Sequence, residues 1–335
     1  MDSIYSDEMN EKEKILLKKI DWRIVPLMFL LYLLSFLDRV NIGNAKLAHL
    51  ERDLGLVGND YNWSLGIFFI GYVLFEIPSN LILFKVRPSI WIPSTMVAWG
   101  ITMSLMAFVN SYSTLMITRF FLGVFEAGLV PGMVYYITLW YKRYEQSFRI
   151  GTILSGASIA GAFSGLLAYA IVNFANENSK LKGWQLVFLI DGLVTVIVAF
   201  VAYFCVEDYP EEAEWLSNEE RELAISRLRK DIDDIDDIKI RSHSFEKVYV
   251  LECLKDWCNV GVAMMLSSGN AGGIIAAQIY RSKDYPHYVP GHIISSGFLL
   301  ASICLCVIQY GALVRLNEMK RKKRNQIKSS GDEKI

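Results

Sequence analysis

The sequence predicts an all-α protein that crosses a membrane several times. Of its 335 residues, 53% are hydrophobic and 21% are charged, whereas a water-soluble domain ordinarily has fewer apolar residues and about a quarter charged ones. Stretches of about 20 apolar residues recur along the chain, and an α-helix needs this length to cross about 30 Å of hydrocarbon. Composition and segment length together indicate a multi-pass membrane protein embedded in the lipid bilayer.

Eight crossings are expected. The first six are predicted near Arg23–Ala45, Trp63–Phe84, Trp91–Val109, Thr114–Leu139, Ile150–Phe174 and Trp184–Val206, and two more near Val260–Ile279 and His292–Leu313. This reading divides the chain into a tail (1–22), a six-helix transmembrane half (23–206), a polar loop (207–257), a two-helix part (258–313) and a basic tail (314–335).

The distribution of lysine and arginine predicts that both termini are cytoplasmic. With that orientation, most basic residues fall on the cytoplasmic side, including the cluster Lys320–Arg324. The outer loops hold only Arg39, Lys46, Arg52, Lys180, Lys182, Arg281 and Lys283. Such an asymmetry is typical of the positive-inside rule. The first span is too long for a signal peptide and is expected to stay in the mature protein.

Two local patterns predict structure within this frame. In the polar loop, Ser217 and Glu220 have the spacing of a capping box, which predicts a short helix as far as Arg229. In the fifth span, Gly161 and Gly165 are four residues apart and predict close packing against another helix. A sliding surface is the alternative for these glycines.

Six ionisable side chains fall within the predicted spans, where such groups ordinarily face a cavity or one another. They are Asp38, Arg39, Glu76, Arg119, Glu126 and Asp191. From the helical rise, Asp38 lies about 10 Å below the outer surface and Arg119 about 8 Å below it. Glu126 lies two turns deeper than Arg119 on nearly the same face. An acid and a base are therefore expected to meet near the outer side, above a second acid.

This arrangement suits the transport of an anion with protons. A buried carboxyl group can take up a proton on one side of the membrane and release it on the other, and an arginine can hold a carboxylate substrate with two hydrogen bonds. A permanent ion pair that links helices is the alternative for Asp38 and Arg119, and an outer-surface charge is the alternative for Arg39. Asp191 is expected to cap or pair locally.

The second span contains Glu76, Pro78 and Asn80 near its cytoplasmic end. Proline there frees backbone groups and permits a bend. The sequence leaves open whether this stretch is part of a gate or a static kink.

Other functions find little support in the sequence. A net charge of −1 shows no bias toward nucleic acid, and the five cysteines have neither metal-site spacing nor a disulfide pattern. The spans hold no set of metal ligands and no nucleophile beside a base. We therefore expect no enzyme activity, no cofactor and no nucleic-acid partner.

Four segments resemble a known family. They are FLDRVNIGNA in the first span, RFFLGVFEAGLVPG in the fourth, WYKRYEQSFRIG after it and GWQLVFLIDG opening the sixth. They are similar to the major facilitator superfamily and, more narrowly, to its anion:cation symporter branch and the fungal allantoate permease-like group. The resemblance covers about residues 20–216.

The resemblance implies two six-helix halves around a central cavity, and carboxylate substrates such as allantoate, nicotinate or pantothenate. It implies that Asp38 and Glu126 are proton-coupling acids, and that Arg119 and Arg39 contact the substrate. The superfamily motif after the second helix is degenerate here. Lys85 and Arg87 remain as gating residues, but no aspartate precedes them.

The later part of the chain departs from the family pattern. Residues 246–257 resemble the approach to the seventh helix, whereas SSGNAGGIIAAQIYRSKDYPHYVPGH resembles the eleventh helix and the loop after it. Helices seven to ten are thus expected to be absent, with the join near Trp257 and Cys258. Asn270 is the remaining candidate substrate contact from the second half.

We therefore expect a secondary active transporter, a proton symporter for a small organic anion, in the plasma membrane. The alternative is a non-transporting truncated or regulatory membrane protein of the same family. Whether the chain forms an oligomer or has a partner chain is left open.

Overall fold

The computed structural model describes residues 2–83, 85–174, 180–233, 270, 272–279 and 287–331. In these residues the regular structure is helical and no strand occurs, which confirms the predicted all-α class. The chain forms two compact units, Met1–Ala277 and Gln278–Ile335, and each is described by itself.

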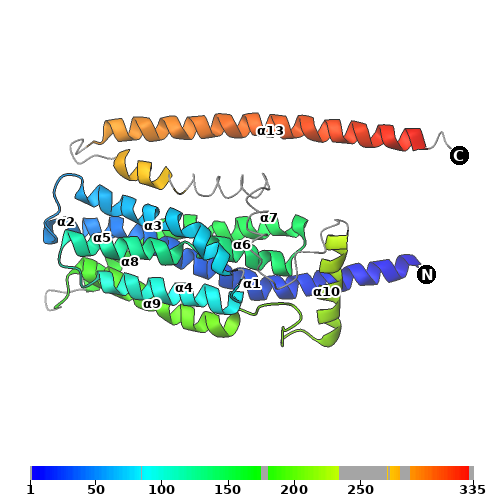
Figure 1. Cartoon of the computed structure of the whole chain (residues 1–335), viewed down its shortest axis with the longest axis horizontal. Coiled ribbons are helices and arrows are strands. Elements are labelled where there is room, and N and C mark those ends of the chain that lie inside the picture. The colour runs from blue at the N-terminus through cyan, green and yellow to red at the C-terminus, as the bar shows by residue number, and fades with distance from the viewer. Residues whose placement is uncertain are drawn as a thin grey trace. The chain divides into compact units, whose positions relative to one another are not determined.

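The helices of the first unit run largely along one common direction, except α10, which crosses it (Figure 1). They are α1 (Asp2–Leu47), α2 (Leu50–Asp53), α3 (Asp60–Leu83), α4 (Pro88–Met106), α5 (Tyr112–Glu126), α6 (Leu129–Trp140), α7 (Arg143–Leu154), α8 (Gly156–Phe174), α9 (Gly183–Cys205) and α10 (Asn218–Asp233).

Six helical segments of the described chain are long and apolar enough to cross a membrane. They are Glu11–Leu47, Asp60–Leu83, Tyr112–Trp140, Arg143–Asn173, Gly183–Cys205 and Val289–Gly311. They coincide with the predicted first, second, fourth, fifth, sixth and eighth spans. At the third, α4 is a helix of 19 residues, but two prolines and several Ser and Thr residues make it less apolar. The seventh, Val260–Ile279, lies largely outside the described residues; 270 and 272–279 are helical.

Two of the predicted spans are interrupted. The fourth is divided into α5 and α6 directly after Glu126. Pro131 has no backbone N–H, and in a continuous helix its ring would clash with the carbonyl group of Ala127. The fifth is divided into α7 and α8 at Ser155. The first of these breaks places Glu126 at the end of a helix.

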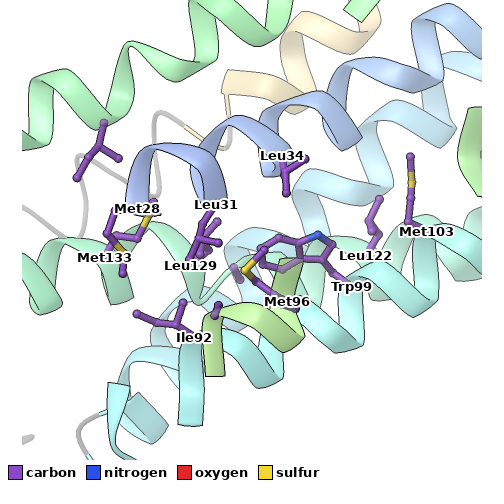
Figure 2. Close-up of a cluster of buried hydrophobic side chains, with 14 of the residues drawn as sticks. Met28, Leu31, Leu34, Ile92, Met96, Trp99, Met103, Leu122, Leu129 and Met133 are labelled. Atoms are coloured by element: carbon purple, nitrogen blue, oxygen red, sulfur yellow. The ribbon is translucent and has the colours of Figure 1, made fainter. Parts of the chain in front are cut away.

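The core of the first unit lies between α1, α4, α5 and α6 (Figure 2). The apolar side chains of α1 and α4 recur at intervals of three or four residues, which is the period of one helix face. The labelled residues are at most 5% exposed: Met28, Leu31, Leu34, Ile92, Met96, Trp99, Met103, Leu122, Leu129 and Met133.

Glycines set the closest helix contacts, but not the glycines that we predicted. Gly71 of α3 and Gly123 of α5 each lie directly against the other helix's backbone, and Gly100 of α4 and Gly192 of α9 do the same. At Gly161 and Gly165 of α8, a Cβ atom would meet no described atom within 4 Å. The predicted close packing there is wrong for the described residues, because both glycines lie on the exposed face of α8.

Ion pairs join α10 to α1 and α7. The predicted capping box is confirmed, since the Ser217 and Glu220 side chains each accept a hydrogen bond from the other's backbone N–H. Lys19 of α1 lies 2.6 Å from Glu220. Arg227, which is buried, pairs with Glu145 of α7 and lies 3.3 Å from Glu13 of α1.

The second unit contains one long helix, α13 (Val289–Gly331), of 43 residues. Its apolar part, Val289–Gly311, is a candidate span. The helix continues without a break through the basic cluster Lys320–Arg324 and across the predicted boundary at 313/314. The predicted join at Trp257 and Cys258 lies outside the described residues.

Candidate functional site

An ion pair between α1 and α5 lies inside the first unit. The Arg39 Nη2 atom is 2.5 Å from the Glu126 Oε1 atom, and the Glu126 side chain is only 1% exposed. The Ser35 hydroxyl group, one turn before Arg39, donates to the same carboxylate oxygen at 2.6 Å. Because α5 ends at Glu126, this carboxylate lies beside the break in the fourth span.

Aromatic rings surround the other side of Arg39. Its guanidinium carbon lies between 5.1 and 5.9 Å from the ring centroids of Phe36, Phe68, Phe69 and Tyr72. A cation above such ring faces is attracted by their electron density. The alternative reading of Arg39 as an outer-surface charge is therefore wrong, since its side chain is 22% exposed and faces carboxylate and rings.

Arg119 of α5 is the second buried arginine. It is 1% exposed, and its Nε and Nη2 atoms have no hydrogen-bond partner among the described residues. Its guanidinium carbon lies 5.9 Å from the Phe188 ring centroid. The expected ion pair with Asp38 does not form in the described chain. Arg119 is therefore a buried cation with donors available to an anion.

Asp38 of α1 faces α4 and α9 instead. Its side chain is fully buried, and Oδ2 accepts hydrogen bonds from Trp99 Nε1 at 2.9 Å and Thr195 Oγ1 at 3.3 Å. Its Oδ1 atom has no partner among the described residues. Asp38 and Arg39 point to different neighbours because consecutive helical residues are about 100° apart around the axis.

Asp191 of α9 lies next to Asp38 and is 4% exposed. Its Oδ2 atom accepts a hydrogen bond from Asn41 of α1, and Asn41 Oδ1 in turn accepts one from Asn44 at 2.9 Å. Asp191 therefore links two helices, where the sequence suggested a cap or a local pair. Ser35, Asp38 and Asn41 are spaced three apart on one face of α1, and that spacing was the signal for this polar face.

The predicted gating residues of α3 differ in how far they are buried. Glu76 is 4% exposed, whereas Pro78 is exposed and Asn80 is half-buried. α3 continues past Pro78 to Leu83 as one helix.

The basic gating residues lie in the turn between α3 and α4. Lys85 is exposed. Arg87 pairs with Glu212 at 3.1 Å and lies 3.6 Å from Asp208, both in the segment after α9. A gating role for these residues and for those of α3 stays a prediction.

Asn270 is helical and half-buried, with undescribed residues on both sides. Gly273, one turn further on, lies against the ring of Phe69, which is one of the rings around Arg39. No contact of the Asn270 side chain with the arginines is described, so its role as a substrate contact stays a prediction. No group of three or more potential metal ligands occurs in the described part of the chain.

Comparison with known proteins identifies the family that this chain resembles. A family model described as Major Facilitator Superfamily matches residues 28–315. A fungal MFS transporter named prlL is 45% identical over 225 residues, which are 65% of this chain and 45% of that protein.

Two bacterial proteins are also similar. One, from Agrobacterium vitis, is provisionally named a tartrate transporter and is 40% identical over 65% of this chain and 48% of its own length. The other, from Pseudomonas putida, is provisionally named metabolite transport protein NicT and is 34% identical over 78% of this chain and 58% of its own length. The chain thus spans about half the length of the curated relatives it matches.

Proposed function

The chain belongs to the Major Facilitator Superfamily, and from that premise we propose that it is a secondary transporter that takes up a small organic anion together with protons. Relatives named as transporters support the general class. The finer assignment, to the anion:cation symporter branch and its allantoate permease-like group, rests on the resemblance of the four sequence segments named above, and the coupling to protons rests on the arginines and acids of α1 and α5.

The main support for this proposal is the buried guanidinium group of Arg119, whose Nε and Nη2 atoms have no hydrogen-bond partner among the described residues. A guanidinium group that is buried without a hydrogen-bond partner is unfavourable, because its donors have lost water and gained nothing in return. A carboxylate that enters beside Arg119 would accept from its two open donors, Nε and Nη2. Arginine suits this task because its planar fork matches the geometry of a carboxylate.

The Arg39–Glu126 pair would couple the anion to a proton. While Glu126 is ionised, it holds Arg39 at 2.5 Å. Protonation of Glu126 removes that negative charge, so Arg39 becomes available as a second contact for the anion. By linkage, the anion binds more tightly to the protonated protein, and the protein binds the proton more tightly when the anion is present.

Binding of small carboxylates to the purified chain tests the role of Arg119. Tartrate and nicotinate are suitable probes, with nicotinamide as the uncharged comparison. We expect Arg119→Gln to weaken carboxylate binding by at least about thirtyfold, since loss of a buried charged partner ordinarily removes 2–5 kcal/mol. Nicotinamide should bind poorly to both proteins.

The matched control is Lys46→Gln, which removes a cation from the partly exposed pair with Glu51. It should leave carboxylate affinity unchanged. If Arg119→Gln binds these carboxylates as well as the wild type does, the proposed role of Arg119 is wrong.

The remaining assignments are part of the same proposal. Asn270 would contact the anion, and Glu76, Pro78, Asn80, Lys85 and Arg87 would belong to the gate. We propose a plasma-membrane location with both termini cytoplasmic. A non-transporting membrane protein of the same family is the competing proposal, and uptake measurements on this chain separate the two.

A further inference from the structure

Two buried carboxyl groups face each other between α1 and α9. Asp38 of α1 accepts from Thr195 of α9, and Asp191 of α9 accepts from Asn41 of α1. Asp191 and Thr195 are one turn apart, and so, nearly, are Asp38 and Asn41. Because α1 and α9 run in opposite directions, the two hydrogen bonds lie at neighbouring levels, and the carboxyl groups of Asp38 and Asp191 are within hydrogen-bonding reach of each other.

The close approach of α4 and α9 places a third helix beside this pair. Gly100 and Gly192 let the two backbones touch, and each is the immediate neighbour of a residue of the cluster, Trp99 or Asp191. Trp99 then reaches Asp38 with its indole N–H at 2.9 Å. All of these side chains are buried.

One buried carboxylate oxygen of this pair has no hydrogen-bond donor among the described residues. Asp38 Oδ2 has two donors, but Asp38 Oδ1 is buried without any donor among the described residues. Ionised carboxylates only accept hydrogen bonds. Contact between two carboxyl groups therefore requires a proton on one of them, and a proton held between Asp38 Oδ1 and the Asp191 carboxyl group would give Asp38 Oδ1 the partner that it lacks.

The charges around the pair lead to the same conclusion. Neither Asp38 nor Asp191 forms an ion pair with a lysine, arginine or histidine of the described chain. Glu126 and Arg119, both from α5, also act on Asp38 electrostatically, and their charges have opposite signs. The residues that reach the pair from α1, α4 and α9 are the neutral Asn41, Trp99 and Thr195. Two adjacent negative charges with no cation in contact are unfavourable in a water-poor interior.

We propose that Asp38 and Asp191 share one proton, and so form a proton-binding site between α1 and α9 that is separate from the Arg39–Glu126 pair. The two groups titrate as a unit rather than as independent acids. Asp191 is thus a proton ligand and not merely a helix link. Its use in transport rests on the proposed function, whereas the proton site itself does not.

Infrared spectroscopy of the purified full chain tests this proposal without any transport substrate. The carbonyl band of a protonated carboxyl group shifts when water is replaced by heavy water, whereas an ionised carboxylate lacks that band. We expect the wild type at neutral pH to show one such band that is absent from Asp38→Asn and from Asp191→Asn. In either variant the new amide donates to the remaining carboxylate, which then needs no proton.

The double variant Asp38→Asn/Asp191→Asn makes the test sharp. If one proton is shared, it loses no more band intensity than either single variant. If each acid carried its own proton, the double variant would lose twice the intensity. The control is Asp60→Asn, an acid at the exposed start of α3 whose carboxylate accepts from the Val57 backbone, and it should keep the band.

Each remaining outcome counts against the proposal. A wild-type band that survives both single substitutions overturns it, and so does the absence of any such band from the wild type. If one single variant fails to fold, the other makes the same comparison. Failure of carboxylate uptake with an intact shared-proton band would overturn the transport proposal alone.

Discussion

Substitution of Glu126 by glutamine should remove the pH dependence of anion binding. Glutamine has nearly the same shape and can still accept from Ser35 and Arg39, but it cannot ionise. It therefore imitates the protonated state of Glu126 at every pH. The contact that loses its charge is the 2.5 Å pair with Arg39, in which the Glu126 side chain is 1% exposed.

The size of the effect follows from that contact. Opposite unit charges about 4 Å apart attract by about 4 kcal/mol at the effective dielectric constant of about 20 that suits protein interiors. The attraction is partly offset because Arg39 keeps its four aromatic rings and some exposure. A coupling of about 1–3 kcal/mol remains reasonable, which corresponds to roughly 5–150-fold in anion affinity between ionised and protonated Glu126.

The assay measures carboxylate affinity of the purified chain across a pH series. The wild type should bind more tightly as the pH falls, and Glu126→Gln should bind tightly and almost equally at every pH. Glu51→Gln is the matched control, because it removes an acid from a partly exposed ion pair with Lys46; it should retain the wild-type profile. A wild-type pH profile in Glu126→Gln would refute the coupling role of Glu126.

Three further predictions concern the architecture. Arg227→Ala leaves Glu145 buried without its partner and should destabilise the chain by about 3–5 kcal/mol, measured as a lower thermal midpoint in detergent; an unchanged midpoint would contradict a buried network. The Lys19 ammonium group lowers the pKa of Glu220 below its ordinary value, so this contact stabilises α10 above about pH 4.3 and is lost as the pH falls through the folded pKa. The hydrogen-exchange protection of α10, corrected for the intrinsic pH dependence of amide exchange, should fall in acid, and Glu220→Gln should abolish that fall. Gly123→Ala places a methyl group against the α3 backbone and should cost about 1–3 kcal/mol in the same thermal assay.

Hydropathy and charge were sufficient to predict the fold class and most spans, because apolar length is what a bilayer requires of a helix. They did not reveal that the fourth span breaks after Glu126. Hydropathy is continuous there, and the break depends on Pro131 and on its conflict with the preceding turn. The packing glycines were also misplaced, because sequence spacing does not say which face of a helix meets a neighbour.

The sequence was sufficient to predict which residues lie in the candidate site, but not which of them contact one another. Counting residues along each helix gave depths, and the arginines and acids of α1 and α5 do lie inside the unit. The partner of each group depends on helix rotation, which turned Arg39 toward Glu126 and Asp38 toward Trp99. The link between Asp38 and Asp191 also requires α1 and α9 to pack side by side, which no local pattern indicates.

Uptake of a labelled small carboxylate into cells that express this chain alone tests the central claim most directly. Surface expression would be measured in parallel, and the external pH would be varied with and without a protonophore. We expect uptake to rise as the external pH falls, and to be lost with the protonophore and in Arg119→Gln. Normal surface expression with no proton-dependent uptake of any carboxylate would contradict the claim.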